Sequence, residues 1–202
     1  EHSVTNRRTY TFAPMKKWPL LLFAAAGLSL TVRPIHADAQ PARYTSANTH
    51  SHNDYEQPTP FWLAWQEGFG SIEADIWLVN GKVIIGHDTE EIKTGRTLED
   101  YYIKPLTACV KKNGGHPYAD TARRLQILID VKEDSVAALA ALITLLDKYP
   151  VLETTPSIKW VISGNRPDPD RYAGYPPFIA FDGILHDRYT PQELAHIALM
   201  SD

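Results

Sequence analysis

Apolar residues recur along the chain in two alternating patterns, which predict strands and helices in turn. The strand-like segments are short and rich in Ile, Val and Leu, and several of them alternate apolar with polar residues. Five of them lie at 47–52, 71–80, 125–134, 157–165 and 178–185. A further strand at 82–88 follows the second of these after the pair Asn80-Gly81, which is typical of a tight hairpin turn.

Helix-like segments, with apolar residues three and four positions apart, fill the intervals at 58–68, 97–115, 135–150 and 190–202. In the second of them, Pro105 should break or kink the helix. The last has Thr190 as its expected N-cap and Glu193 to complete a capping box, with proline at the first helical position. We therefore expect the chain to end in a helix.

Strands that are each followed by a helix or loop, and that are apolar enough to be buried on both faces, indicate a parallel α/β sheet with right-handed crossovers. Two arrangements of such a sheet are possible, a doubly wound sheet and a (β/α)8 TIM barrel. The first strand is followed by no glycine-rich phosphate loop, which weakens the nucleotide-binding version of the doubly wound sheet. A barrel needs about 250 residues. As a barrel, the sequence would hold only the first five βα units and would be truncated at its C-terminus.

Composition is that of one globular domain without a disulfide framework. The 202 residues are 44% hydrophobic and 22% charged, which is enough to form one sizeable core. Cys109 is the single cysteine. Neither an internal disulfide nor a cysteine-based metal cluster can therefore form within one chain.

The first forty residues have the pattern of a targeting segment. From Met15, two lysines precede an apolar run to about Leu30 and a small-residue ending, ADA, at 37–39. We expect a secreted or periplasmic protein with no stable membrane span after cleavage. The predicted organisation is a spurious upstream extension at 1–14, a signal peptide at 15–39 and a partial barrel domain at 40–202. This domain keeps 15 of the 20 basic residues and 22 of the 24 acidic ones, so no nucleic-acid partner is expected.

Carboxylates stand on two of the predicted strands at a spacing that places them on one face. Glu73 and Asp75 are two residues apart on the second strand, and two buried negative charges side by side are very unfavourable without a cation. Asp130 and Lys132 share a face of the strand at 125–134 in the same way. A hard divalent cation, Mg²⁺ or Ca²⁺, removes the penalty. The alternative for Glu73 and Asp75 is a solvated strand face, and the alternative for Asp130 and Lys132 is a structural salt bridge.

Two histidines are expected close to these carboxylates, at the same end of the predicted barrel. His52 ends the first strand and His87 closes the hairpin, and a pair of imidazoles can share acid and base steps near neutral pH. His50 and His52 are separated only by Ser51, so the alternative is that the two bind a metal ion together as a His-x-His clamp. We expect His52 to be the catalyst and His50 a supporting residue.

The motifs HND, EAD, HD and DVK, in this order, resemble the phosphatidylinositol phospholipase C-like phosphodiesterases, a (β/α)8 barrel superfamily that includes glycerophosphodiester phosphodiesterases and sphingomyelinase D-type phospholipases. The run from His50 to Asp88 is especially similar to a bacterial branch related to the altered-inheritance-of-mitochondria proteins. The resemblance implies a phosphoric diester hydrolase acting on a glycerophosphodiester or phospholipid-type substrate, either a small molecule or a lipid.

The resemblance also assigns roles to the residues that match the motifs. It implies an acid/base pair of His52 and His87, a cation held by Glu73, Asp75 and Asp130, and a phosphate contact from Lys132. Asn53, beside the catalytic histidine, and Arg166, at the end of the strand 157–165, are further expected substrate contacts. Glycerophosphodiesterases usually have Arg-Gly where Asn53 and Asp54 follow His52, so their substrate is not carried over. Their third ligand is usually glutamate, whereas Asp130 matches the sphingomyelinase D type.

Two rival functions stay open. A His-x-His pair on a first barrel strand also resembles the metal clamp of amidohydrolases and of polymerase-and-histidinol-phosphatase domains. Those sites need further histidines on later strands, but the strand 157–165 and its turn offer only Ser163, Asn165 and Arg166. The other rival is a secreted binding domain without turnover, against which the retained histidines and carboxylates argue.

Overall fold

The computed structural model describes residues 43–202 of the chain. The expected upstream extension and signal peptide, 1–14 and 15–39, lie outside the described residues, and the secreted or periplasmic location stays a prediction. Within 43–202, none of the helices combines the length and the apolar character that a bilayer crossing requires.

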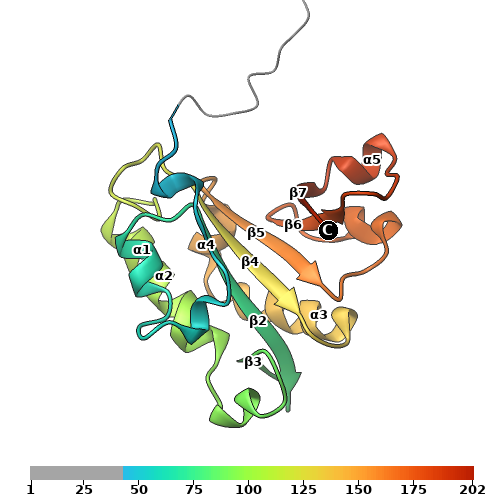
Figure 1. Cartoon of the computed structure of the whole chain (residues 1–202), viewed down its shortest axis with the longest axis horizontal. Coiled ribbons are helices and arrows are strands. Elements are labelled where there is room, and N and C mark those ends of the chain that lie inside the picture. Colours follow the sequence, from blue (N-terminus) through green and yellow to red (C-terminus); the bar gives the residue numbers. More distant parts are fainter. Residues whose placement is uncertain (1–42) are drawn as a thin grey trace, which may run out of the picture. The chain divides into compact units, whose positions relative to one another are not determined.

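The domain is a mixed α/β structure built around one curled, mostly parallel sheet that forms a half-barrel (Figure 1). Six strands are parallel in the order β1-β2-β4-β5-β6-β7, and β3 pairs antiparallel with β2, as the hairpin prediction requires. The strands are β1 (His50–Ser51), β2 (Ser71–Val79), β3 (Lys82–Ile85), β4 (Leu125–Val131), β5 (Ile158–Gly164), β6 (Ile179–Ile184) and β7 (Ile197–Ser201).

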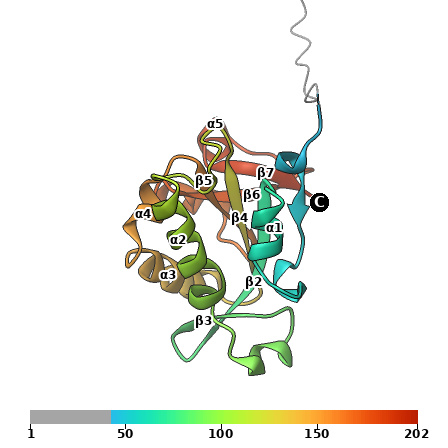
Figure 2. The ribbon, with the colours of Figure 1, turned by 90° about the vertical axis from the view of Figure 1, so that its left-hand side faces the viewer.

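Helices connect the parallel strands. Figure 2 shows α2, α3 and α4 gathered beside the central strands. The helices are α1 (Trp62–Gln66), α2 (Lys104–Lys112), α3 (Ser135–Leu146), α4 (Pro150–Thr154) and α5 (Pro191–Leu194), with a π-helical turn at Glu99–Ile103 and 3-10 turns at Ser46–Asn48, Asp54–Glu56, Glu91–Thr94 and Pro169–Gly174.

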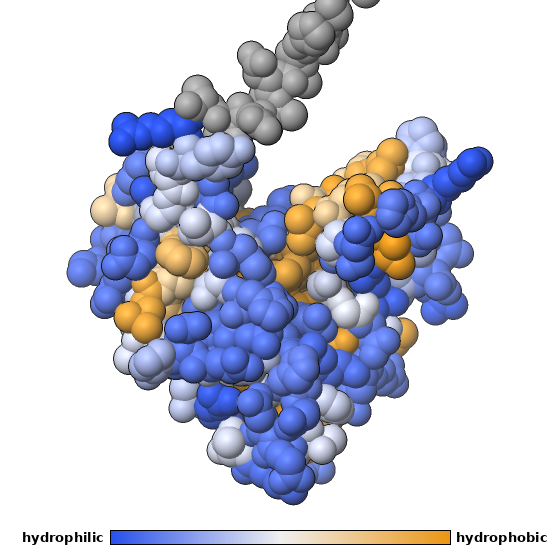
Figure 3. All heavy atoms as spheres, viewed as in Figure 1, coloured by the Kyte–Doolittle hydropathy of each residue, from blue (hydrophilic) through white to orange (hydrophobic). Residues whose placement is uncertain are grey.

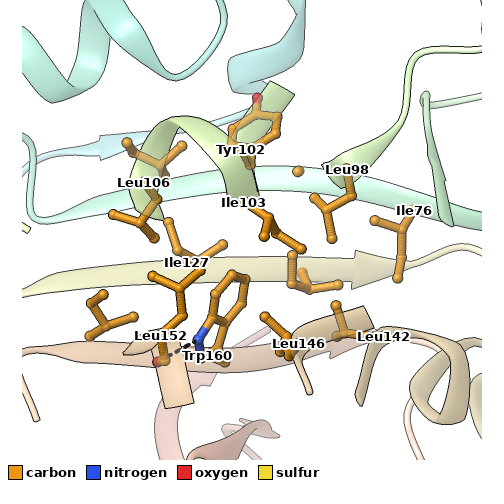
Figure 4. Packing of buried hydrophobic residues seen from close by; sticks show 14 of the residues in the cluster. Ile76, Leu98, Tyr102, Ile103, Leu106, Ile127, Leu142, Leu146, Leu152 and Trp160 are labelled. Atoms are coloured by element: carbon orange, nitrogen blue, oxygen red, sulfur yellow. Dashed lines mark hydrogen bonds between the residues drawn. The ribbon is translucent and has the colours of Figure 1, made fainter. Parts of the chain in front are cut away.

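The main core fills the space between the sheet and these helices. Trp160 of β5 is fully buried there, and its indole N–H donates to the carbonyl of Leu152 at 3.4 Å (Figure 4). Alternate strand residues face the concave side, where Leu128, Val161 and Ala180 form a second, small apolar cluster. Because side chains alternate along a strand, the carboxylates that share this face are separated from the main core by the sheet.

The predicted C-terminal helix is wrong beyond its first turn. The capping box between Thr190 and Glu193 forms, but α5 ends at Leu194 and the next residues form β7. β7 pairs with β6 through an irregular register, in which Ile197 lies opposite Phe181 and Leu199 opposite Asp182. Because of this β-bulge, Ile197 packs against the main core and Leu199 against the small apolar cluster on the other face. The described chain therefore has six parallel strands, one more than the five predicted. Exposed apolar side chains gather over this region (Figure 3), among them Ile184, Leu185, Leu194 and Met200.

Three other predicted elements differ in extent. β1 is only two residues long because the residues before it, 46–48, form a 3-10 helix capped by Thr45. The helix predicted at 58–68 is reduced to α1. Pro105 does not break its helix, since it lies in the first turn of α2, directly after the π-helical turn, where a proline needs no backbone partner.

A buried carboxylate fixes the loop that follows β1. The side chain of Asp54 is fully buried, with Oδ1 accepting from the Ser51 hydroxyl at 2.7 Å. Its Oδ2 accepts from the backbone N–H of Phe61 at 2.5 Å and from the Tyr102 hydroxyl at 2.8 Å. Burial, reinforced by the charge of Asp54, raises the pKa of Tyr102, so this phenol stays a donor. Asp54 thus joins the loop to a helix far along the chain.

We predict that Asp54→Ala lowers the free energy of unfolding by about 3 to 5 kcal/mol, because it leaves three donors without an acceptor in a buried place. Urea unfolding measures the change. Asp88→Ala is the matched control, because Asp88 is exposed and its carboxylate accepts from the backbone N–H groups of Glu90 and Glu91; it should lower stability by about 1 kcal/mol. Equal losses in the two variants would show that the Asp54 network does not stabilise the fold.

Candidate active site

Three carboxylates from two neighbouring strands converge on the concave face of the sheet. β2 carries Glu73 and Asp75, and the parallel register with β4 places Asp75 directly opposite Asp130. One carboxylate oxygen from each of the three lies within 4.8 Å of the other two. Glu73 and Asp75 are buried and Asp130 is partly buried. The structure therefore brings together the three residues that the sequence assigns to a cation.

The two oxygens of Asp75 have opposite surroundings. Oδ2 accepts from the hydroxyl of Tyr55 at 2.9 Å and lies 2.9 Å from Nδ1 of His87 and 2.7 Å from Nζ of Lys132. Oδ1 is buried and has no hydrogen-bond partner among the described residues. Three donors thus fix the orientation of the carboxylate through one oxygen, and the other oxygen is open to a ligand that brings its own positive charge.

The electrostatics of the cluster favour a further positive charge. Burial raises the pKa of Asp130, and the charges of Asp75 and Glu73 add to this effect, while Lys132 opposes it. Burial also works against the Lys132 ammonium, but its bond to Asp75 and the charge of Asp130 outweigh that effect and raise its pKa. Three carboxylates and one ammonium leave two negative charges in a largely buried place.

The residues present fit a divalent cation. Carboxylate oxygens are the ligands that Mg²⁺ and Ca²⁺ prefer, and the charge to be balanced is that of one such ion. The unpartnered Oδ1 of Asp75 is a buried polar atom that would otherwise remain unsatisfied. Glu73, Asp75 and Asp130 are therefore the residues that could hold the ion.

His87 lies at the end of the β2–β3 hairpin with one ring nitrogen bound and its ring exposed. Its backbone N–H donates to Glu91 at 2.8 Å, and Nδ1 faces Asp75, while 60% of the side chain is accessible. A ring nitrogen that donates to a carboxylate leaves the other nitrogen, Nε2, able to exchange a proton with a bound molecule. His87 therefore has one ring nitrogen held by Asp75 and an exposed ring.

His50 is held at both ring nitrogens. Nε2 lies 2.7 Å from Oε2 of Glu73, and Nδ1 lies 2.8 Å from the hydroxyl of Ser71. The Ser71 hydroxyl oxygen also accepts from the amide of Gln126 at 3.2 Å. The contact at Nε2 orients the carboxylate of Glu73.

His52 lies beside His50 in the turn after β1, with its ring centroid 6.4 Å from that of His50. Its ring is exposed and makes no hydrogen bond or ion pair within residues 43–202. It lines a hollow of about 280 Å³ together with His50, Leu63, Glu67 and Phe69. The structure places His52 next to the site and leaves both of its ring nitrogens open, without a contact to the carboxylates.

Of the three expected substrate contacts, only Lys132 touches the cluster. Its ammonium bridges Asp75 and Asp130, at 2.7 and 3.4 Å. Asn53 is a turn residue with φ of 45°, and its amide donates to Glu56 at 3.3 Å. The guanidinium of Arg166 donates to the carbonyl of Gly164 at 3.3 Å, beside a hollow of about 290 Å³ after β5. Neither pairs with the carboxylates.

Tyr55 is a site residue that the sequence patterns did not reveal. Its hydroxyl donates to Asp75, and burial together with this bond raises the pKa of Tyr55, so that it remains a donor. Arg96 donates to the carbonyl of Tyr55 at 2.8 Å and lies over its ring. The only available signal was an aromatic residue within a polar loop, three positions after His52, and no periodicity points from there to β2.

Fold and site together define a parallel α/β protein with carboxylates, an ammonium and an imidazole on the concave face of its sheet. Residues 39–150 match the AIM6-like phosphodiesterase domain, and the chain belongs to this family. The matched span contains every residue of the carboxylate cluster and all three histidines discussed above.

Curated relatives carry the name altered inheritance of mitochondria protein 6. The homolog from Arthroderma benhamiae is 31% identical over 157 residues, which cover 58% of this chain and 50% of that protein. The proteins from Kluyveromyces lactis and Eremothecium gossypii are 32% and 36% identical over 113 and 77 residues, which cover 44% and 34% of this chain and 27% and 20% of theirs. The chain thus spans half or less of these relatives. No solved structure matches it.

We predict that Asp130→Asn stabilises the protein at pH 7 in the presence of a chelator. The folded protein binds a proton at Asp130 more tightly than the unfolded chain does, so this group supports the fold at low pH and loses that effect as the pH rises through its raised pKa. The urea midpoint should therefore rise at pH 7, and the gain should vanish near pH 3. Asp170→Asn, at an exposed site, should change nothing. A lower midpoint for Asp130→Asn at pH 7 would contradict this electrostatic picture.

Proposed function

We propose that the chain is a metal-dependent phosphoric diester hydrolase that acts on a glycerophosphodiester or phospholipid-type substrate. The observation that carries the proposal is the unpartnered Oδ1 of Asp75 within a cluster of three carboxylates, beside the exposed ring of His87. Membership of a family named for a phosphodiesterase domain supports the reaction class.

Glu73, Asp75 and Asp130 would hold one divalent cation, Mg²⁺ or Ca²⁺. When bound, such an ion polarises the phosphodiester oxygens and offsets the negative charge that develops on them. Lys132, which already contacts two of the carboxylates, places a second positive charge at the same position. The net charge of the cluster then suits an anionic phosphodiester.

His87 and His52 share the two proton transfers. Asp75 holds Nδ1 of His87, which directs Nε2 outward and stabilises the ring when it is protonated. His52 has both nitrogens open for the complementary role. One imidazole removes the proton from the attacking hydroxyl, which is either an alcohol of the substrate, giving a cyclic phosphate, or a water molecule. The other donates a proton to the leaving alkoxide.

The remaining parts of the substrate would contact the rim of the site. Arg166 lies beside a hollow after β5, at the same end of the parallel strands as the carboxylates, and would bind an anionic or polar group there. Asn53 lies next to His52, directly after β1, which is the first strand in the sheet order. It would contact the substrate from the side opposite to Arg166. The curled sheet itself would be part of a (β/α)8 barrel, which is supported by its parallel order and by polar residues near the C-terminal ends of the strands.

The arrangement of His50 disfavours the His-x-His clamp. A clamp needs a free nitrogen on each histidine aimed at one ion. In His50, however, both nitrogens already face Ser71 and Glu73. This histidine fits the role of a positioning residue for a ligand carboxylate.

We predict that His87→Ala and His52→Ala each lower the rate of hydrolysis of bis-(p-nitrophenyl) phosphate by about 100-fold or more, because each removes an acid/base group. His50→Ala should cost less, since Glu73 keeps its place on β2. Chelation should abolish activity, and added Mg²⁺ or Ca²⁺ should restore it.

His186→Ala is the matched control, because this exposed histidine lies 3.3 Å from Asp202 and outside the carboxylate cluster, and it should leave the rate unchanged. If His50→Ala abolished activity while His52→Ala spared it, the acid/base assignment would be wrong and the clamp would be favoured.

A further inference from the structure

Gly164, the last residue of β5, lies against the third carboxylate of the cluster. We propose that Gly164 is a positioning residue for the carboxylate of Asp130. The inference rests on the proposed function, in which Asp130 is one of three ligands to a divalent cation.

The register of the sheet brings the glycine to this place. Asp130 pairs with Ser163, and Val131 pairs with Gly164. The next backbone N–H, of Asn165, donates to the carbonyl of Val131 at 2.8 Å, which ties the end of β5 to β4. Both backbones are therefore fixed where the carboxylate of Asp130 emerges.

The Asp130 carboxylate occupies the space that a side chain at position 164 would fill. A Cβ atom on Gly164 would lie 2.6 Å from the carbonyl oxygen of Val131, 3.0 Å from Cγ of Asp130, and closer still to Oδ1 of Asp130. The same Oδ1 faces the Lys132 ammonium at 3.4 Å. The carboxylate is thus confined between the glycine and the lysine, and any larger residue at 164 must displace it.

Backbone conformation adds a separate requirement for glycine. Gly164 has φ of +66°, which L-residues with a side chain rarely adopt. Gly95 has nearly the same φ, +69°, but a Cβ there would meet nothing within 4 Å. The two positions share the conformational requirement, and only Gly164 has the steric one. Gly95→Ala therefore reports the backbone effect alone.

The first test compares Gly164→Ala with Gly95→Ala in the full chain. We expect Gly164→Ala to lower the urea midpoint further than Gly95→Ala does, and to weaken Mn²⁺ binding, followed by electron paramagnetic resonance, by about 10-fold or more. Gly95→Ala should retain the Mn²⁺ affinity of the original protein. Equal Mn²⁺ affinities in the two variants would overturn the proposal.

The second test is a double-mutant cycle on stability, which needs no cation. Asp130→Asn keeps the size of the side chain, whereas Asp130→Ala removes it. The drop in urea midpoint caused by Gly164→Ala should be unchanged in the Asp130→Asn background, because the volume at position 130 is retained. It should be clearly smaller in the Asp130→Ala background, although part remains because of the Val131 carbonyl.

The cycle separates the inference from the proposed function. If the original protein bound no Mn²⁺, the cation site would fail, and the cycle would still report whether Gly164 makes room for Asp130. If Gly164→Ala did not fold, recovery of a folded protein by the added Asp130→Ala change would support the contact. Midpoint shifts that simply add in the Asp130→Ala background, or a double variant that also fails to fold, would overturn it.

Discussion

The convergence of three carboxylates, two of them buried and one partly buried, is the constraint on which the site depends. Removing like charges from water beside one another is strongly unfavourable unless donors or cations surround them. The chain meets part of this requirement with the donors on Oδ2 of Asp75 and with the His50 contact to Glu73. The residues that make these contacts lie in β1, in the loop after it, in the hairpin and directly after β4. The site therefore depends on the correct pairing of several strands. The charge left over, together with the open oxygen of Asp75, is the feature that a divalent cation would satisfy.

Much of this site could be predicted because strand geometry is local. The spacing of Glu73 and Asp75 puts both on one face, and the family resemblance added Asp130, which parallel pairing with β4 brings next to them. Tyr55 could not be predicted, since its hydroxyl reaches Asp75 from a loop whose path depends on the buried Asp54. The strand β7 was missed because a strong helix start preceded it, and pairing with β6 decides the outcome from outside the segment.

The two neighbouring histidines differ in the freedom of their ring nitrogens. Both belong to one short polar segment, and residue type alone does not show which of them has free ring nitrogens. In the structure, His50 is engaged by Ser71 and Glu73, while His52 makes no hydrogen bond within the described part of the chain. An engaged imidazole orients its neighbour, and a free one can exchange protons with a bound molecule. The same reasoning gives His87 an intermediate arrangement, with one nitrogen fixed by Asp75 and the other open.

The central claim, that the carboxylate cluster is a cation site, is tested most directly by anomalous X-ray diffraction from crystals soaked in Mn²⁺. The account predicts one peak at a coordination distance of about 2.0 to 2.6 Å from Oδ1 of Asp75, with oxygens of Glu73 and Asp130 also in contact. It would be contradicted by crystals that show no peak at this position, with Oδ1 of Asp75 bonded instead to a protein group.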